Sequence, residues 1–172
     1  MARRLRNVAP LLISVSSAYL FCGCPDVDTA ETDNGGSDPS TTLTCGDLIG
    51  KVELDAIIGG ISDFDESDTP FCEFDNGAGT GSIQAFSGAS NYESMKNGAI
   101  DAYGEENVLI TNNIGEQSFE WEAALITTIV TSQVGFLDST SRYAVLITTD
   151  SNTGGMAAAR AIALAVNANL RN

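Results

Sequence analysis

The chain contains no histidine, and this absence excludes much of enzyme chemistry. A Ser-His-Asp triad, a Cys-His pair and a metal site with imidazole ligands all need that side chain. The sequence also lacks both standard glycine-rich loops that cradle phosphate groups. We therefore expect no catalytic residues, no metal site and no cofactor.

Basic residues are scarce: 8 Lys and Arg stand against 23 Asp and Glu. Three of the basic residues (Arg3, Arg4 and Arg6) lie at the N-terminus, whereas all 23 acidic residues follow Cys24. Without residues 1–23, the chain carries 5 basic and 23 acidic side chains, a net charge of −18. A chain with this much negative charge repels nucleic acids and anionic lipid headgroups. We therefore expect no nucleic-acid partner and no electrostatic attachment to a membrane.

The N-terminal apolar stretch is short. Residues 8–21 are largely apolar and follow a short basic segment, which is the layout of an export signal. The stretch falls below the roughly 20 residues that a membrane-spanning helix needs. An export signal is therefore favoured over a permanent membrane helix.

The end of this segment resembles the lipobox of bacterial lipoproteins. Gly23 and Cys24 match its last two positions, while Phe21 and Cys22 stand where an aliphatic and a small residue are usual. The resemblance implies cleavage after residue 23 and acylation of Cys24, by a diacylglycerol thioether and further chains such as palmitate. The protein would then be anchored to the cell membrane or the outer membrane on the extracytoplasmic side. A secretory signal with an unacylated Cys24 and an uncleaved signal anchor remain alternatives.

The remainder divides into a linker and a folded domain. Residues 24–42 include five acidic residues and almost no apolar bulk, a composition typical of a disordered spacer. Residues 43–172 are predicted to form one α+β domain, in which an antiparallel sheet packs with about three α-helices. The expected helices are 47–58, with Asp47 as N-cap, 91–103 and 156–170. The expected strands are 71–75 paired with 81–87, 108–110 beside 117–121, and a long hairpin of 124–134 with 143–149.

Short motifs of this domain resemble the DUF3558-type lipoproteins. The pattern runs Cys45, Leu48-Ile49, Gly59 and then Cys72 followed by Glu73-Phe74. Residues 114–119 resemble the central motif of those proteins, with Ser118 where a small apolar residue is usual. The resemblance implies a PsbP/Mog1-like sandwich of helices and sheet, and it supports a fold more than an activity.

Two cysteines lie in the predicted domain, Cys45 and Cys72. An exported protein reaches an oxidising compartment, where such a pair commonly forms a disulfide. A metal pair or a reactive thiol is the weaker alternative because no histidine completes a site.

Acidic residues gather at Asp63, Asp65, Glu66 and Asp68. Their spacing suggests a calcium loop, but an EF-hand needs Gly at its sixth position and Glu at its twelfth. Counting from Asp63, those places hold Asp68 and Phe74. A solvated acidic loop is therefore the favoured interpretation.

A second acidic group contains Glu116, Glu120 and Glu122. On one strand, Glu120 and Glu122 would share a face opposite Phe119 and Trp121. Paired carboxylates could serve a sugar-cleaving enzyme, but a charged face opposite a buried aromatic face explains them as well. The aromatic residues Phe119, Trp121, Phe136 and Tyr143 are expected in the core, with a ligand groove as the alternative.

The sequence favours a lipid-anchored, non-catalytic envelope protein that binds another protein or a small ligand. A lipid-anchored hydrolase or sugar-active enzyme is the main rival, and a purely structural envelope component is the third possibility.

Overall fold

The structure, a computed structural model, describes residues 43–126 and 129–172. The helices of this part are α1 (Cys45–Leu48), α2 (Lys51–Ile58), α3 (Ala89–Tyr103), the 3₁₀ turn η1 (Glu105–Asn107) and α4 (Gly155–Asn169). Its strands are β1 (Asp63–Phe64), β2 (Phe71–Asp75), β3 (Thr80–Ser87), β4 (Leu109–Thr111), β5 (Gln117–Ile126), β6 (Ile129–Leu137) and β7 (Tyr143–Asp150).

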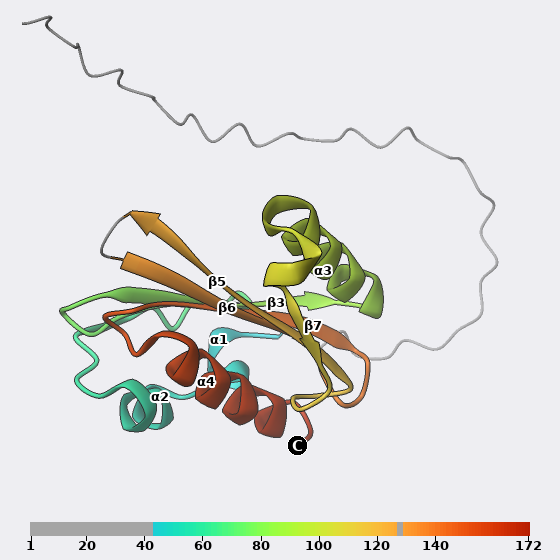
Figure 1. Ribbon diagram of the computed structural model, residues 1–172. Helices are drawn as coiled ribbons and strands as arrows, with labels where there is room; N and C mark the ends of the chain where they lie inside the picture. Colours follow the sequence, from blue (N-terminus) through green and yellow to red (C-terminus); the bar gives the residue numbers. More distant parts are fainter. Residues whose placement is uncertain (1–42, 127–128) are drawn as a thin grey trace, which may run out of the picture. The chain divides into compact units, whose positions relative to one another are not determined.

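These strands form one antiparallel sheet in the order β1-β2-β3-β7-β6-β5-β4. The helices α1, α2 and α4 lie on one face of the sheet, and α3 lies on the other (Figure 1). The predicted α+β class, with helices packed on an antiparallel sheet, is confirmed. The described residues contain four α-helices instead of about three because the first expected helix is divided.

The predicted helix over 47–58 is wrong in two respects. It is broken between α1 and α2, where Ile49 and Gly50 adopt extended conformations. The break places the Ile49 side chain in the core, where it is fully buried. Thr44, not Asp47, is the N-cap, and the Asp47 carboxylate accepts hydrogen bonds from the Thr44 N–H at 2.8 Å and the Thr44 hydroxyl at 2.7 Å.

The prediction of one strand over 124–134 is also wrong. β5 continues to Ile126 and β6 begins at Ile129, and the two pair with each other. The intervening residues 127–128 lie outside the described residues. No Gly, Pro, Asn or Asp interrupts this β-branched run, so the sequence carries no turn signal there. The pairing of β2 with β3, of β4 with β5 and of β6 with β7 agrees with the expected strands, and α3 and α4 begin and end within two residues of the predicted helices.

The main core lies between the sheet and α1, α2 and α4. Phe74 and Phe136 are the buried rings of this core, and Tyr143 packs against its margin. Phe74 lies over its cross-strand partner Gly81, where a Cβ atom would come within 2.2 Å of the Phe74 ring. The core therefore requires glycine at position 81 as well as large apolar side chains around it.

A smaller core lies between α3 and the opposite face of the sheet. Phe119 and Trp121 point into it from β5, and Tyr92 points into it from α3. The Phe119 ring covers Gly135, where a Cβ atom would lie 2.3 Å from the ring. Phe119, Trp121, Phe136 and Tyr143 thus occupy core positions, as the sequence predicts.

The loop between β6 and β7 is organised by one buried carboxylate, Asp138. It accepts hydrogen bonds from the Tyr143 N–H at 2.6 Å, from the Thr140 N–H at 2.9 Å and from the Thr140 hydroxyl. Burial alone would raise the pKa of Asp138, but these hydrogen bonds hold its pKa below the usual value. The fold therefore gains stability from the ionised form of this side chain.

Candidate functional site: an acidic groove on the open sheet face

The face of the sheet that carries α3 is covered over only part of its area. Side chains alternate between the two faces of a strand. Because Ile83 and Ile147 point into the main core, Ser82 and Thr148 point to the α3 side. Both of these polar residues line an open groove beyond α3.

This groove has a volume of about 970 Å³ and is lined by parts of β1, β2, β3, β6 and β7. We call it the acidic groove because five carboxylates line it, those of Asp63, Asp65, Glu73, Asp75 and Asp150. Four of them lie within residues 63–75, and the sheet order β1-β2-β3-β7 brings the distant Asp150 to the same face.

Hydroxyl groups lie beside the carboxylates in cross-strand pairs. Glu73 pairs with Ser82, and Ser82 pairs with Thr148 on the next strand. Asp75 pairs with Thr80 in the neighbouring row. The acidic groove therefore presents acceptor oxygens interspersed with hydroxyls that both donate and accept hydrogen bonds.

Two of the carboxylates are fixed by turns. Asp75 accepts hydrogen bonds from the Gly77 N–H and, at 2.9 Å, from the Ser62 hydroxyl, and both interactions lower its pKa. Asp150 accepts N–H groups of the turn that follows β7, at 2.8–2.9 Å, and the Thr80 N–H at 3.1 Å. These two side chains contribute negative charge, while most of their hydrogen-bonding capacity serves the fold.

Asp63, Asp65 and Glu73 are different, because they are exposed and accept no side-chain hydrogen bond within the described residues. The basic side chains of this part of the chain lie elsewhere, and none of them lines the acidic groove. Lys96, for example, pairs with Glu93 on α3. The three free carboxylates thus face solvent without a compensating positive charge.

The acidic residues considered for calcium do not gather at one point. Asp63 and Asp65 line the acidic groove, whereas Glu66 and Asp68 do not. Across residues 43–126 and 129–172, no three His, Cys, Asp or Glu side chains are placed so that they could hold a metal ion. Asp63 and Phe64 form the short strand β1 beside β2, which the sequence did not reveal in this polar stretch.

The second acidic group is divided among three separate contacts. Glu116 accepts a hydrogen bond from Ser141, and Glu122 accepts one from Ser132 at 2.7 Å. Glu120 is 5 % exposed, so it is no part of a solvated face, and it binds the guanidinium of Arg160 with both carboxylate oxygens. That pairing raises the pKa of Arg160. Sequence reasoning missed the ion pair because Arg160 lies 40 residues further along the chain.

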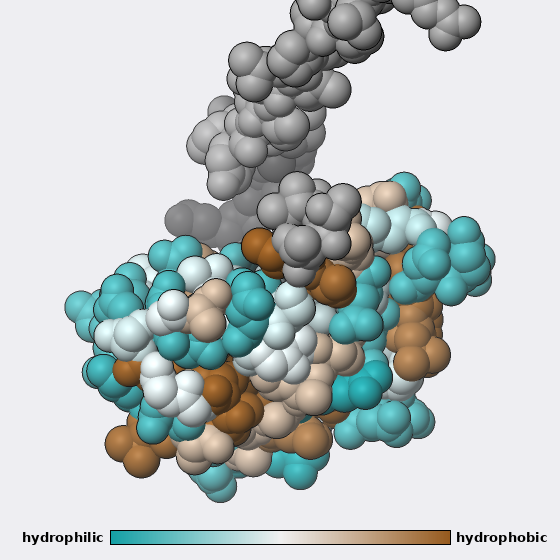
Figure 2. All heavy atoms as spheres, turned by 60° about the vertical axis from the view of Figure 1, so that its left-hand side comes forward, coloured by the Kyte–Doolittle hydropathy of each residue, from teal (hydrophilic) through white to brown (hydrophobic). Residues whose placement is uncertain are grey.

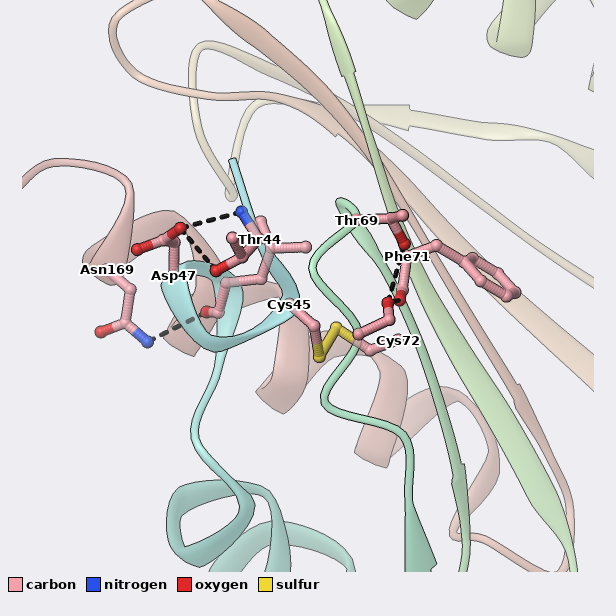
Figure 3. Close-up of a disulfide and its surroundings, with 9 residues drawn as sticks. Thr44, Cys45, Asp47, Thr69, Phe71, Cys72 and Asn169 are labelled. Carbon is pink, nitrogen blue, oxygen red and sulfur yellow. Dashed lines mark hydrogen bonds between the residues drawn. A yellow bond between two sulfur atoms is a disulfide. The ribbon is translucent and has the colours of Figure 1, made fainter. Parts of the chain in front are cut away.

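The two domain cysteines form a disulfide, with their Cα atoms 5.4 Å apart (Figure 3). Both are fully buried, so the bond joins the first turn of α1 to β2 within the main core. The Asn169 amide donates to the Leu48 carbonyl at 3.0 Å and holds α1 against α4 on the same side. The predicted pairing of Cys45 with Cys72 is confirmed.

Exposed apolar side chains are spread over several elements, with Val52 on α2, Leu164 on α4, and Leu109 and Ile110 on β4. The surface seen in Figure 2 accordingly shows separate apolar patches among hydrophilic residues. The expected alternative of a groove lined by Trp121 is not what the structure shows, because Trp121 is only 5 % exposed beneath α3.

Cys22, Cys24 and the predicted linker over 24–42 lie outside the described residues. Within the described ranges, no helix has the length and apolar character required to cross a lipid bilayer.

Comparisons with family models, with curated proteins and with solved structures give no match to this chain. The resemblance to DUF3558-type lipoproteins therefore stays a prediction from short motifs.

Proposed function

We propose that the protein is a lipid-anchored component of the cell envelope whose domain binds a partner, without catalysis, at the acidic groove. Acyl chains on Cys24 would hold it to the cell membrane or the outer membrane. Residues 24–42 would act as a spacer, and as a flexible coil they would span on the order of 20–25 Å. The DUF3558-like motifs are in keeping with this assignment.

The disulfide supports the extracytoplasmic part of the proposal. Structural disulfides persist in oxidising compartments and are rare where glutathione and thioredoxin keep thiols reduced. The Cys45–Cys72 bond lies in the main core, so it serves stability and not surface redox chemistry. Such a bond fits a chain that begins with the layout of an export signal.

The acidic groove is the observation that carries the binding role. A groove of about 970 Å³ has the size of a ligand site, and its lining is polar and acidic where small-molecule pockets are mostly apolar. Its three free carboxylates face solvent without a positive partner in the described fold. A partner that supplies positive charge would complement them, and nothing in such an interaction requires a catalytic step.

The rival, a sugar-active enzyme, would need one carboxylic acid to donate a proton while another carboxylate attacks or activates water. Glu120 and Glu122 share a face of β5, but their neighbours do not suit these roles. Arg160 occupies both oxygens of Glu120, and Ser132 bonds to Glu122. Neither carboxylate therefore has both oxygens free for a substrate or a water molecule. The arrangement favours a structural role for this pair.

Membrane fractionation of a Cys24→Ser variant tests the anchor. We expect the variant to leave the membrane fraction, whereas Cys22→Ser, a matched change in the same segment, should remain with membranes. If the Cys24→Ser protein still sediments with membranes after a salt wash, the lipid anchor is wrong.

Capture of partners from native envelopes by the lipidated protein tests the binding role. Neutralising the free carboxylates by Asp63→Asn, Asp65→Asn and Glu73→Gln should reduce the capture. An unchanged set of captured partners would show that the acidic groove is not the binding surface.

A further inference from the structure

We infer that the partner of the acidic groove is an extended basic polypeptide segment, held by Lys and Arg side chains across the open face of the sheet. This inference rests on the binding role proposed above and names the chemical class of the partner.

The carboxylates are spread along the acidic groove. Four of them stand on or beside β1 and β2 and the fifth, Asp150, stands on β7, which the order β1-β2-β3-β7 separates from β1 by three strand spacings. At about 4.8 Å per spacing, the charged row is about 14 Å long. A single metal ion needs its ligands gathered around one point, and the described residues place no three acidic side chains in that way. A row of this length calls for several positive charges on one ligand.

The length of this row matches the spacing of side chains along an extended peptide. Consecutive residues of a β-strand rise about 3.3 Å, so alternate side chains, which share one face, are about 6.6 Å apart. Three Lys or Arg residues at alternate positions therefore cover about 13 Å. An extended segment with this pattern places its cations along the row while its other side chains point away from the sheet.

Hydroxyl groups lie between the charges. The hydroxyls of Thr80, Ser82 and Thr148 stand on the same face as the carboxylates and are partly or fully exposed. Hydroxyls donate and accept hydrogen bonds, so they can satisfy the N–H and C=O groups of a peptide laid over them. An apolar ligand would leave these groups without partners, at a cost for each one.

The whole domain is strongly acidic. Residues 43–172 contain 18 acidic and 5 basic side chains, a net charge of −13. A field of that sign attracts basic segments from a distance and repels nucleic acids and anionic lipid surfaces. Of the macromolecules in an envelope, a basic polypeptide is thus the class that the groove favours.

The test uses the full mature lipoprotein in a non-ionic detergent and a labelled ten-residue peptide of alternating Lys and Ser, at low ionic strength. Binding is followed by fluorescence anisotropy. The groove variant carries Asp63→Asn, Asp65→Asn and Glu73→Gln, which keep side-chain size and remove no side-chain hydrogen bond found in the described fold. Exposed ion pairs contribute about a factor of two each, so the variant should bind roughly tenfold more weakly.

A matched control carries Asp101→Asn, Glu105→Gln and Glu106→Gln, three exposed residues at the end of α3 and in η1 that lie outside the groove. It removes the same total charge, so long-range attraction falls equally. We expect its affinity for the peptide to stay within about twofold of the unmodified protein, because local pairing is intact. An equal loss in both variants would overturn the inference, since the peptide would then sense only net charge.

Two competitors separate peptide binding from small-cation binding. Spermine and Ca²⁺ are each added at a concentration that supplies as much positive charge as the peptide, and we expect them to displace the labelled peptide poorly. Displacement as effective as that by unlabelled peptide would overturn the inference. Partner capture from native envelopes distinguishes this failure from failure of the proposed function. If the groove variant loses native partners but the protein never binds the basic peptide, the groove is a binding site for another class of partner. If capture is also unchanged, the binding role itself is wrong.

Discussion

Reduction of the Cys45–Cys72 disulfide should destabilise the domain by about 3.5 kcal/mol. The two cysteines are 27 residues apart in the sequence, and that loop length sets the chain entropy that the cross-link removes from the unfolded state. Reduction leaves both sulfur atoms in their buried positions, so the packing of the main core changes little. The loss therefore reports mainly on the cross-link, which joins the start of α1 to β2.

Urea unfolding of the purified protein, followed by far-ultraviolet circular dichroism with and without reductant, measures this loss directly. A thermal scan should show a melting temperature lower by about 10 °C in reductant, given the size of the domain. The double variant Cys45→Ala/Cys72→Ala should lose about 1–2 kcal/mol more than reduction does, because it also removes two buried sulfur atoms. As a control, the same reductant should leave the double variant unaffected. A reduced protein that loses less than about 1 kcal/mol would refute the claim that the disulfide stabilises the fold through loop closure.

Three other perturbations test particular contacts. Glu120→Gln should lower the free energy of unfolding in urea by about 1–2 kcal/mol because it weakens the bidentate pair with Arg160, and the exposure of that guanidinium limits the loss. An unchanged unfolding midpoint would contradict the role given to this pair. Gly135→Val should lower the melting temperature strongly, because the valine side chain would displace the Phe119 ring. A stable variant with unchanged Trp fluorescence would show that the close approach of the Phe119 ring to residue 135 is not required. Hydrogen bonds hold the pKa of Asp138 below its ordinary value, so its contribution is complete above about pH 4 and is lost as pH falls through the lower folded pKa. Asp138→Asn should therefore destabilise the protein at pH 7 and make its free energy of unfolding fall less steeply as the pH is lowered. An identical fall at acid pH would show that Asp138 does not cause the pH dependence.

The parts of the fold that could be predicted are those with local signals. α3 ends at Tyr103, directly before Gly104, where the chain takes a positive φ, and the turn after Asp75 contains the Asn-Gly pair that joins β2 to β3. α4 is a long Ala-rich run without a breaker. In each case periodicity and turn chemistry agree with the tertiary structure.

The misassigned parts depend on tertiary contacts that periodicity does not record. Ile49 fits helical spacing, yet burial in the main core is gained by leaving the helix at that residue. The boundary between β5 and β6 lies in a β-branched run that reads as one strand. Glu120 alternates with buried neighbours as a surface residue does, but α4 covers it. The sequence of α4 gives no local sign that Arg160 pairs with Glu120.

The acidic groove could be predicted only in part. The alternation of Glu73, Ser82 and Thr148 with buried neighbours indicates a polar face on each strand. The order of the strands in the sheet brings these polar faces together. They stay open because α3 covers only part of that side of the sheet. Neither property follows from local sequence patterns.

The central claim is that an oxidised, acidic domain is tethered to the envelope through Cys24. Intact-mass spectrometry of the protein from native membranes, without reductant, tests it most directly. The account predicts a chain that begins at Cys24, carries the mass of a diacylglycerol and further acyl groups, and has two hydrogen atoms fewer than the reduced form because Cys45 and Cys72 are joined. A chain that begins elsewhere, or a Cys24 without lipid, would contradict it.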